Sequence, residues 1–251
     1  MIVRLAEALA YTGTIAAILA VSISIFVFLF LGSGINYILL VLIFCGTLVI
    51  YNLDHLKDIE SDKTTNPKRV KFISGNKFLI YSIIGISFAL SVSAVYFLGT
   101  HLVPLIILPF LFGLFHRIIK NSPAFSAVYI TLSWLMITVY LPAYLTGEPG
   151  KIIFLSIIIG ILLFFNAYTS SLRQKYYAPQ YVRYMMYLSL PILLLLIIIR
   201  GNYLGLIPLS FFTTMALTNY IDDENYELIF LDGLQLSGAV LSILFLILIK
   251  L

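Results

Sequence analysis

Most of this chain consists of apolar runs about 20 residues long, separated by short polar breaks. An α-helix needs about 20 consecutive apolar residues to cross a hydrocarbon core roughly 30 Å thick. The runs lack the short alternating segments of a transmembrane β-barrel. The sequence therefore predicts an all-α, polytopic membrane protein with about nine transmembrane helices, at residues 6–32, 36–53, 77–98, 102–116, 124–145, 152–172, 184–200, 203–221 and 229–250.

The composition supports this class. Of the 251 residues, 61% are hydrophobic and 10% are charged, whereas a soluble domain carries roughly 25% charged residues. No hydrophilic segment or linker interrupts the apolar runs, so we expect one helical domain over residues 1–251. No basic arm studded with aromatic residues is present, which argues against nucleic acid as a partner.

The basic residues predict an orientation in the cell membrane. Cytoplasmic loops of multi-pass proteins carry an excess of Lys and Arg. With the N-terminus and the loops after even-numbered spans on one side, that side holds 12 of the 15 basic residues. We therefore expect a cytoplasmic N-terminus and an outer C-terminus. The twelve residues are Arg4, Lys57, Lys63, Lys68, Arg69, Lys71, Lys77, Arg117, Lys120, Arg173, Lys175 and Arg183.

Three aspartates at four-residue spacing follow the second apolar run: Asp54, Asp58 and Asp62. On a helix this spacing places successive side chains on one face, about 5–6 Å apart at Cβ. Their mutual repulsion costs stability unless a cation lies between them. Mg²⁺ fits, because proteins hold it through one or two carboxylates together with substrate phosphates. The alternative interpretation is a solvated, charged helix end.

Basic residues on the same predicted side could bind phosphate oxygens. Lys68 and Arg69 follow the aspartates directly, and Arg117 and Lys120 lie three residues apart in the next cytoplasmic loop. All four residues could instead serve only to set the membrane topology.

Two further polar patterns repeat the four-residue spacing. Asn166, Ser170 and Gln174 form a neutral stripe at the end of the sixth run, with Arg173 beside it. This stripe could contact a ligand or form hydrogen bonds between helices. Asp223 and Glu227 end the eighth run, as a second metal-binding face or as a hydrated loop.

The aspartate pattern resembles the first aspartate-rich motif of the UbiA superfamily of intramembrane prenyltransferases. Asp58 and Asp62 then match the family's metal-binding aspartates, Asp54 takes the place of its Asn, and His55 that of its first Asp. The segment Asn66-Pro67-Lys68-Arg69 resembles the basic segment that follows the motif. The resemblance implies a nine-helix fold, Mg²⁺, a prenyl diphosphate donor and a lipophilic acceptor.

One departure from the family lies at the end of the sixth span. The family places its second aspartate motif there, whereas this chain has the neutral stripe of Asn166, Ser170 and Gln174. The leading hypothesis is a Mg²⁺-dependent prenyltransferase. A non-catalytic isoprenoid- or lipid-binding membrane protein on the same scaffold is the alternative. An ion-coupled transporter is a weaker one, because the internal repeats typical of such proteins are not apparent.

Overall fold

The protein is described by a computed structural model covering residues 2–109, 111, 122–173, 206–218 and 232–250. Every regular element among these residues is a helix, which confirms the all-α prediction for the described chain. Five helices are long and apolar enough to cross a membrane. They cover Thr14–Leu31, Tyr37–Lys57, Lys77–Leu98, Ala124–Leu145 and Pro149–Tyr168. The count of nine spans stays a prediction, since the seventh, at 184–200, lies outside the described residues.

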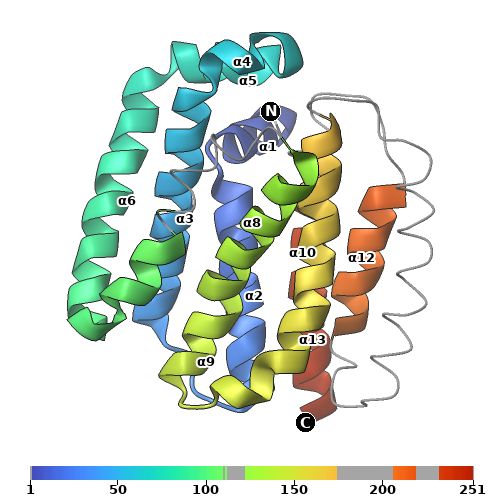
Figure 1. The fold of residues 1–251 in the computed structure, drawn as a ribbon. Helices are drawn as coiled ribbons and strands as arrows, with labels where there is room; N and C mark the ends of the chain where they lie inside the picture. Colours follow the sequence, from blue (N-terminus) through green and yellow to red (C-terminus); the bar gives the residue numbers. More distant parts are fainter. Residues whose placement is uncertain (1, 110, 112–121, 174–205, 219–231, 251) are drawn as a thin grey trace.

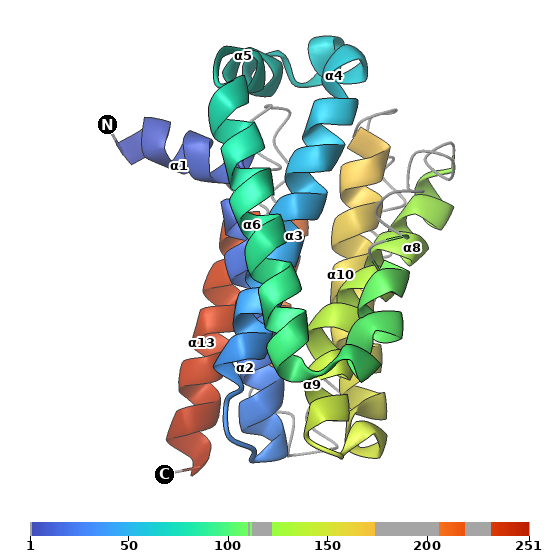
Figure 2. The same cartoon turned by 90° about the vertical axis from the view of Figure 1, so that its left-hand side faces the viewer.

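Helix α2 (Thr14–Leu31) forms the centre of the bundle. On one side it packs against α3 (Tyr37–Lys57), which in turn packs against α6 (Lys77–Leu98). On another side it contacts α13 (Asp232–Lys250). Buried side chains of α2 contribute to both apolar cores of the described chain, Val27 to one and Phe28 to the other. Figures 1 and 2 show α2 enclosed by the outer helices.

The first predicted span, 6–32, is in fact two helices. Helix α1 (Ile2–Tyr11) ends at a turn through Thr12 and Gly13, and only then does α2 begin. Gly13 has φ +69°, a left-handed conformation that glycine adopts at little cost, and a Cβ there would lie 2.7 Å from Cβ of Tyr51. The turn is thus pressed against α3, and α1 projects sideways from the bundle (Figure 2).

The second predicted span ends later than expected. Helix α3 continues four residues beyond residue 53, to Lys57, and two short helices follow: α4 (Ile59–Thr65) and α5 (Pro67–Gly75). Pro67 suits the first position of α5, where a backbone N–H would lack a helical partner. Figure 2 shows α4 and α5 lying across the end of the bundle from which α1 projects.

The fifth predicted span contains a local irregularity. It comprises α8 (Pro123–Leu135), a π-helical turn at Met136–Tyr140, and α9 (Leu141–Leu145). Pro142 has no N–H to donate to the carbonyl of Thr138, four residues earlier. Ser24 Oγ of α2 lies 3.2 Å from that carbonyl oxygen and 2.9 Å from the carbonyl oxygen of Ala20 in its own helix. A hydroxyl has one proton to donate, so Ser24 shares it between the two carbonyls and links α2 to the irregular helix.

The remaining described helices complete the bundle. A 3₁₀ turn at Thr100–Leu102 opens the short apolar helix Thr100–Pro109. Another at Pro149–Ile152 leads into α10 (Ile153–Arg173), and α12 (Ile207–Thr218) packs against α13. Helices α1, α4 and α5 lie at one end of the bundle and the C-terminal end of α13 at the other (Figure 1). The predicted topology requires these two groups of elements on opposite sides of a membrane, and the arrangement is compatible with it. Which side is cytoplasmic stays a prediction.

Candidate functional site at the end of α3

Six polar side chains are buried where α3, α4 and α5 meet, and we call this group the polar cap. Taken as whole residues, none is more than 8% exposed, although two are aspartates and one is an arginine. Charged side chains are almost never fully buried unless they are paired. A cluster of this kind at the end of an apolar bundle is therefore the leading candidate for a functional site. Its members are Asn52, His55, Asp58, Asp62, Asn66 and Arg69.

The three predicted aspartates do not lie on one straight helix. Asp58, with φ −90° and ψ 2°, separates α3 from α4. The backbone N–H of Asp58 still donates to the carbonyl of Asp54 at 2.9 Å, and that of Asp62 to the carbonyl of Asp58 at 2.8 Å. The chain bends without losing these bonds. Asp58 and Asp62 are buried, whereas Asp54 is only half-buried.

Asp62 and Arg69 form a buried ion pair. Arg69 Nη2 lies 2.5 Å from Asp62 Oδ2, and the two side chains are 9% and 7% exposed. The pair joins α4 to α5, because seven residues and the break at Asn66 bring the two side chains back together. Of the two basic residues predicted here to bind phosphate, Arg69 is buried in the cap and Lys68 is exposed on α5.

His55 connects this ion pair to α1. Its Nδ1 lies 3.0 Å from the carbonyl oxygen of Tyr11, the last residue of α1. Its Nε2 lies 3.5 Å from Arg69 Nη1, a long contact. A carbonyl oxygen can only accept, so Nδ1 carries the proton and Nε2 is left to accept from the guanidinium. His55 therefore links the end of α1 to Arg69.

Asn52 binds the next backbone carbonyl along the chain, that of Thr12. Its Nδ2 donates to the carbonyl oxygens of Thr12 and Leu48, both at 2.8 Å. The last carbonyls of a helix have no partner within it, so Asn52 and His55, one turn apart on α3, cap the end of α1. The rings of Tyr11 and Phe72 lie 5.5 Å apart and add a contact from α5.

Sequence reasoning assigned no role to three members of the cap. Asn66 was detectable, because it continues the four-residue spacing of the aspartates, and its N–H donates to the carbonyl of Asp62 at 2.8 Å. His55 was identified only as the residue at the place of the resembled family's first Asp, with no role. Asn52 gave no signal beyond being polar at the end of an apolar run. The roles of both depend on α1, which was predicted to belong to the first span.

A protein-only metal site is not apparent in the described part of the chain. No group of three or more His, Cys, Asp or Glu side chains there could hold a metal ion. Magnesium commonly takes only one or two carboxylates and completes its shell with phosphate oxygens and water. The predicted role of Asp54, Asp58 and Asp62 in binding Mg²⁺ therefore stays a prediction.

The first residue of the neutral stripe, Asn166 of α10, takes part in packing. Asn166 Nδ2 donates to Gln235 Oε1 of α13 at 2.7 Å, a hydrogen bond between helices. Ser170 and Arg173 belong to α10, but their side chains are outside the description. The other predicted site residues, Arg117, Lys120, Gln174, Asp223 and Glu227, lie outside the described residues.

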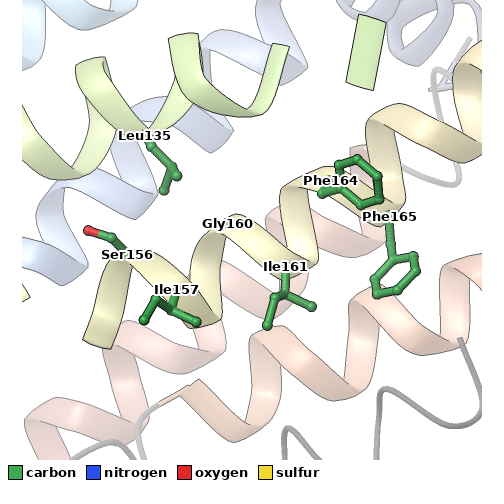
Figure 3. Close-up of a pocket in the computed structure, with 7 residues that line it drawn as sticks. All are labelled: Leu135, Ser156, Ile157, Gly160, Ile161, Phe164 and Phe165. Atoms are coloured by element: carbon green, nitrogen blue, oxygen red, sulfur yellow. The ribbon is translucent and has the colours of Figure 1, made fainter. Parts of the chain in front are cut away.

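An apolar groove of about 480 Å³ runs along α10 beside α8 (Figure 3). Gly160 lies at its centre, and a Cβ there would come 3.1 Å from Cδ1 of Leu135. Apart from Ser156, its lining is hydrocarbon, so its chemistry suits an alkyl or isoprenoid chain rather than a charged group. The lining residues are Leu135, Ser156, Ile157, Gly160, Ile161, Phe164 and Phe165.

Comparison of the chain with protein-family models, with curated proteins and with solved structures finds no match. The resemblance to the UbiA superfamily therefore stays a prediction, carried by the residues that surround Asp58 and Asp62.

Proposed function

We propose that this protein is an intramembrane prenyltransferase that binds the diphosphate of a prenyl donor at the polar cap and transfers the prenyl group to a lipophilic acceptor. The observation that carries the proposal is the burial of Asp58, Asp62 and Arg69 together at the end of an apolar bundle. A prenyl diphosphate combines an apolar chain with a charged diphosphate group. The protein likewise combines an apolar helix bundle with a buried charged end.

The residues of the cap fit a magnesium diphosphate. Asp58 and Asp62 supply hard, anionic oxygen atoms of the kind Mg²⁺ prefers, and the phosphates of the donor would complete its shell. When bound, the metal would neutralise charge on the departing diphosphate. The Arg69 guanidinium has a planar fork of donors that matches phosphate oxygens. Its charge would favour departure of the diphosphate by the same electrostatic means.

The test is diphosphate release from labelled prenyl diphosphates of several chain lengths, measured with purified protein and Mg²⁺. Asp58→Asn and Asp62→Asn should abolish Mg²⁺-dependent diphosphate binding, because each removes an anionic ligand. Asp54→Asn should be milder, since the resembled family carries Asn at that place.

Glu60→Gln is the matched control. It removes one negative charge two residues from both aspartates, but the Glu60 side chain is 81% exposed and is paired with Lys63. A loss equal to that of Asp58→Asn would mean that net charge, and not a site, is being measured. A larger loss in Asp54→Asn than in Asp58→Asn would show that the alignment of the motif is wrong.

The second candidate function is non-catalytic binding of an isoprenoid or another lipid on the same scaffold. The hydrogen bond from Asn166 to Gln235 favours it, because the first residue of the neutral stripe is used to join two helices. That stripe stands where the resembled family carries its second acidic motif. Bound isoprenoid recovered on purification, without diphosphate release from any donor, would select this function.

A further inference from the structure

We propose that His55 is a positioning residue, which holds the guanidinium of Arg69 in the orientation that receives the diphosphate. The inference rests on the proposed function of the polar cap and adds a residue to which neither the aspartate pattern nor the family resemblance gives a role. It is argued from the contacts on the two sides of the imidazole ring.

The first step is the anchoring of His55 itself. Its Nδ1–H donates to the carbonyl of Tyr11 at 3.0 Å, and the side chain is 6% exposed. The Tyr11 carbonyl belongs to the backbone, and the adjacent carbonyl of Thr12 is held by Asn52. The ring is therefore fixed against backbone, independently of any ligand in the cap.

The second step is the effect of this anchoring on Arg69. With Nδ1 protonated, Nε2 presents a lone pair to Arg69 Nη1 at 3.5 Å, while Nη2 lies 2.5 Å from Asp62. The guanidinium is planar, so holding both terminal nitrogens fixes its plane. An arginine held in this way loses less conformational freedom when a phosphate binds, which is how positioning residues raise affinity.

The third step is that the two ring nitrogens can be tested separately. The side-chain amide of Asn ends near the place of Nδ1, and that of Gln near the place of Nε2. His55→Asn can therefore keep the donor to Tyr11 but loses the acceptor for Arg69. His55→Gln can keep the acceptor for Arg69 but loses the contact that holds α1.

The experiment measures binding of inorganic pyrophosphate with Mg²⁺ by calorimetry, together with the thermal stability of each purified variant. His55→Asn should weaken binding about tenfold, the lower end of what loss of an orienting partner costs. His55→Gln should bind within about threefold of wild type, even if its thermal stability falls below that of His55→Asn. A purely structural role predicts that affinity and stability fall together.

A second measurement tests whether His55 acts through Arg69. In an Arg69→Gln background the difference between the Asn and Gln variants should disappear, as a double-mutant cycle requires for residues that act as a unit. Because each variant retains one hydrogen bond of the histidine, the test does not depend on the folding of His55→Ala.

The outcomes separate the inference from the function on which it rests. Equal binding by wild type and both variants would overturn the positioning role and leave the proposed function standing. So would normal binding by His55→Asn with weak binding by His55→Gln, since His55 would then serve only to hold α1. Absence of pyrophosphate binding in wild type would overturn the proposed function, and the role of His55 with it.

Discussion

The polar cap and the contact between α10 and α13 solve the same problem in different ways. Both contain polar residues taken from four-residue spacings at the ends of apolar helices. In the cap, the buried Asp62 is met by the cation of Arg69. Between α10 and α13, Asn166 is met by Gln235, and no charge is involved. An amide is satisfied by another amide, whereas a buried carboxylate needs a cation close by.

The difference has an energetic consequence. Moving two charges out of water costs several kcal/mol per ion, and a buried ion pair often does no more than offset this cost. An amide pair carries a much smaller penalty and suffices to hold two helices together. Stability alone therefore gives little reason for charges in the cap. A charged ligand such as a magnesium diphosphate would give one, which is why we place the site there and not on α10.

The largest expected effect comes from breaking the charged pair. Arg69→Met leaves the buried Asp62 without its cation and should lower the free energy of unfolding by about 3–5 kcal/mol. Reversible unfolding in mixed detergent micelles measures it. Arg69→Met combined with Asp62→Leu should recover part of the loss, because no buried charge then lacks its partner. If Arg69→Met lowers the free energy of unfolding by less than Asn166→Leu does, the charged polar cap is not the costlier region to disrupt, and the contrast between the two regions is wrong.

The next effect concerns the turn that holds α1 against the cap. Gly13→Ala puts a Cβ 2.7 Å from Cβ of Tyr51, on a left-handed backbone. We expect a loss of about 2–4 kcal/mol, from the strained backbone and the overpacked contact together. Gly32→Ala is the matched control, because Gly32 has φ +70° but nothing within 4 Å of its added Cβ. It should cost only the backbone part, about 1 kcal/mol. Equal losses at the two glycines would mean that the turn is not pressed against α3.

A smaller effect is expected at the neutral contact. Asn166→Leu should cost about 1 kcal/mol, the usual size of a hydrogen bond between membrane helices. Combining it with Gln235→Leu should add little, since neither amide is then left alone. Diphosphate release, if present in wild type, should persist in the double variant. Its complete loss, with the fold retained, would place Asn166 in the substrate site and not only in the packing.

Some of the helix boundaries could be predicted from the sequence, and others could not. The third span was predicted at the residues α6 occupies, because Lys77 and Gly99 mark its ends clearly. The break between α1 and α2 was missed, since Gly13 stands within a long apolar run and a single glycine does not reveal its backbone conformation. Its φ of +69° and its close approach to Tyr51 are seen only in the folded chain.

The candidate site, too, could be predicted only in part from the sequence. Spacing identified Asp58 and Asp62, and the position of Arg69 directly after the aspartates made it a candidate for binding phosphate. The spacing also suggested one straight helical face, which is wrong, because α3 ends before Asp58 and α4 starts after it. The pairing of Asp62 with Arg69 depends on how α5 turns back, and the link through His55 depends on where α1 lies. Contacts of this kind are tertiary, and one sequence read for periodicity does not contain them.

The smallest effect on the free energy of unfolding is expected at an exposed ion pair, and it is the reference against which the larger effects are compared. Lys63 and Glu60 form an ion pair of 2.7 Å, close in length to that of Asp62 and Arg69, but their side chains are 57% and 81% exposed. In water the attraction is screened and holding two long side chains costs entropy, so Lys63→Met should change the free energy of unfolding by less than about 0.5 kcal/mol. The same measurement as for Arg69→Met gives this value, and raising the salt concentration should reduce it further. Two ion pairs on neighbouring residues of one short segment would then differ several-fold in effect, with burial as the cause. A loss at Lys63 as large as that at Arg69 would mean that α4 and α5 are held by their charges in general, and would remove the energetic reason for singling out the polar cap.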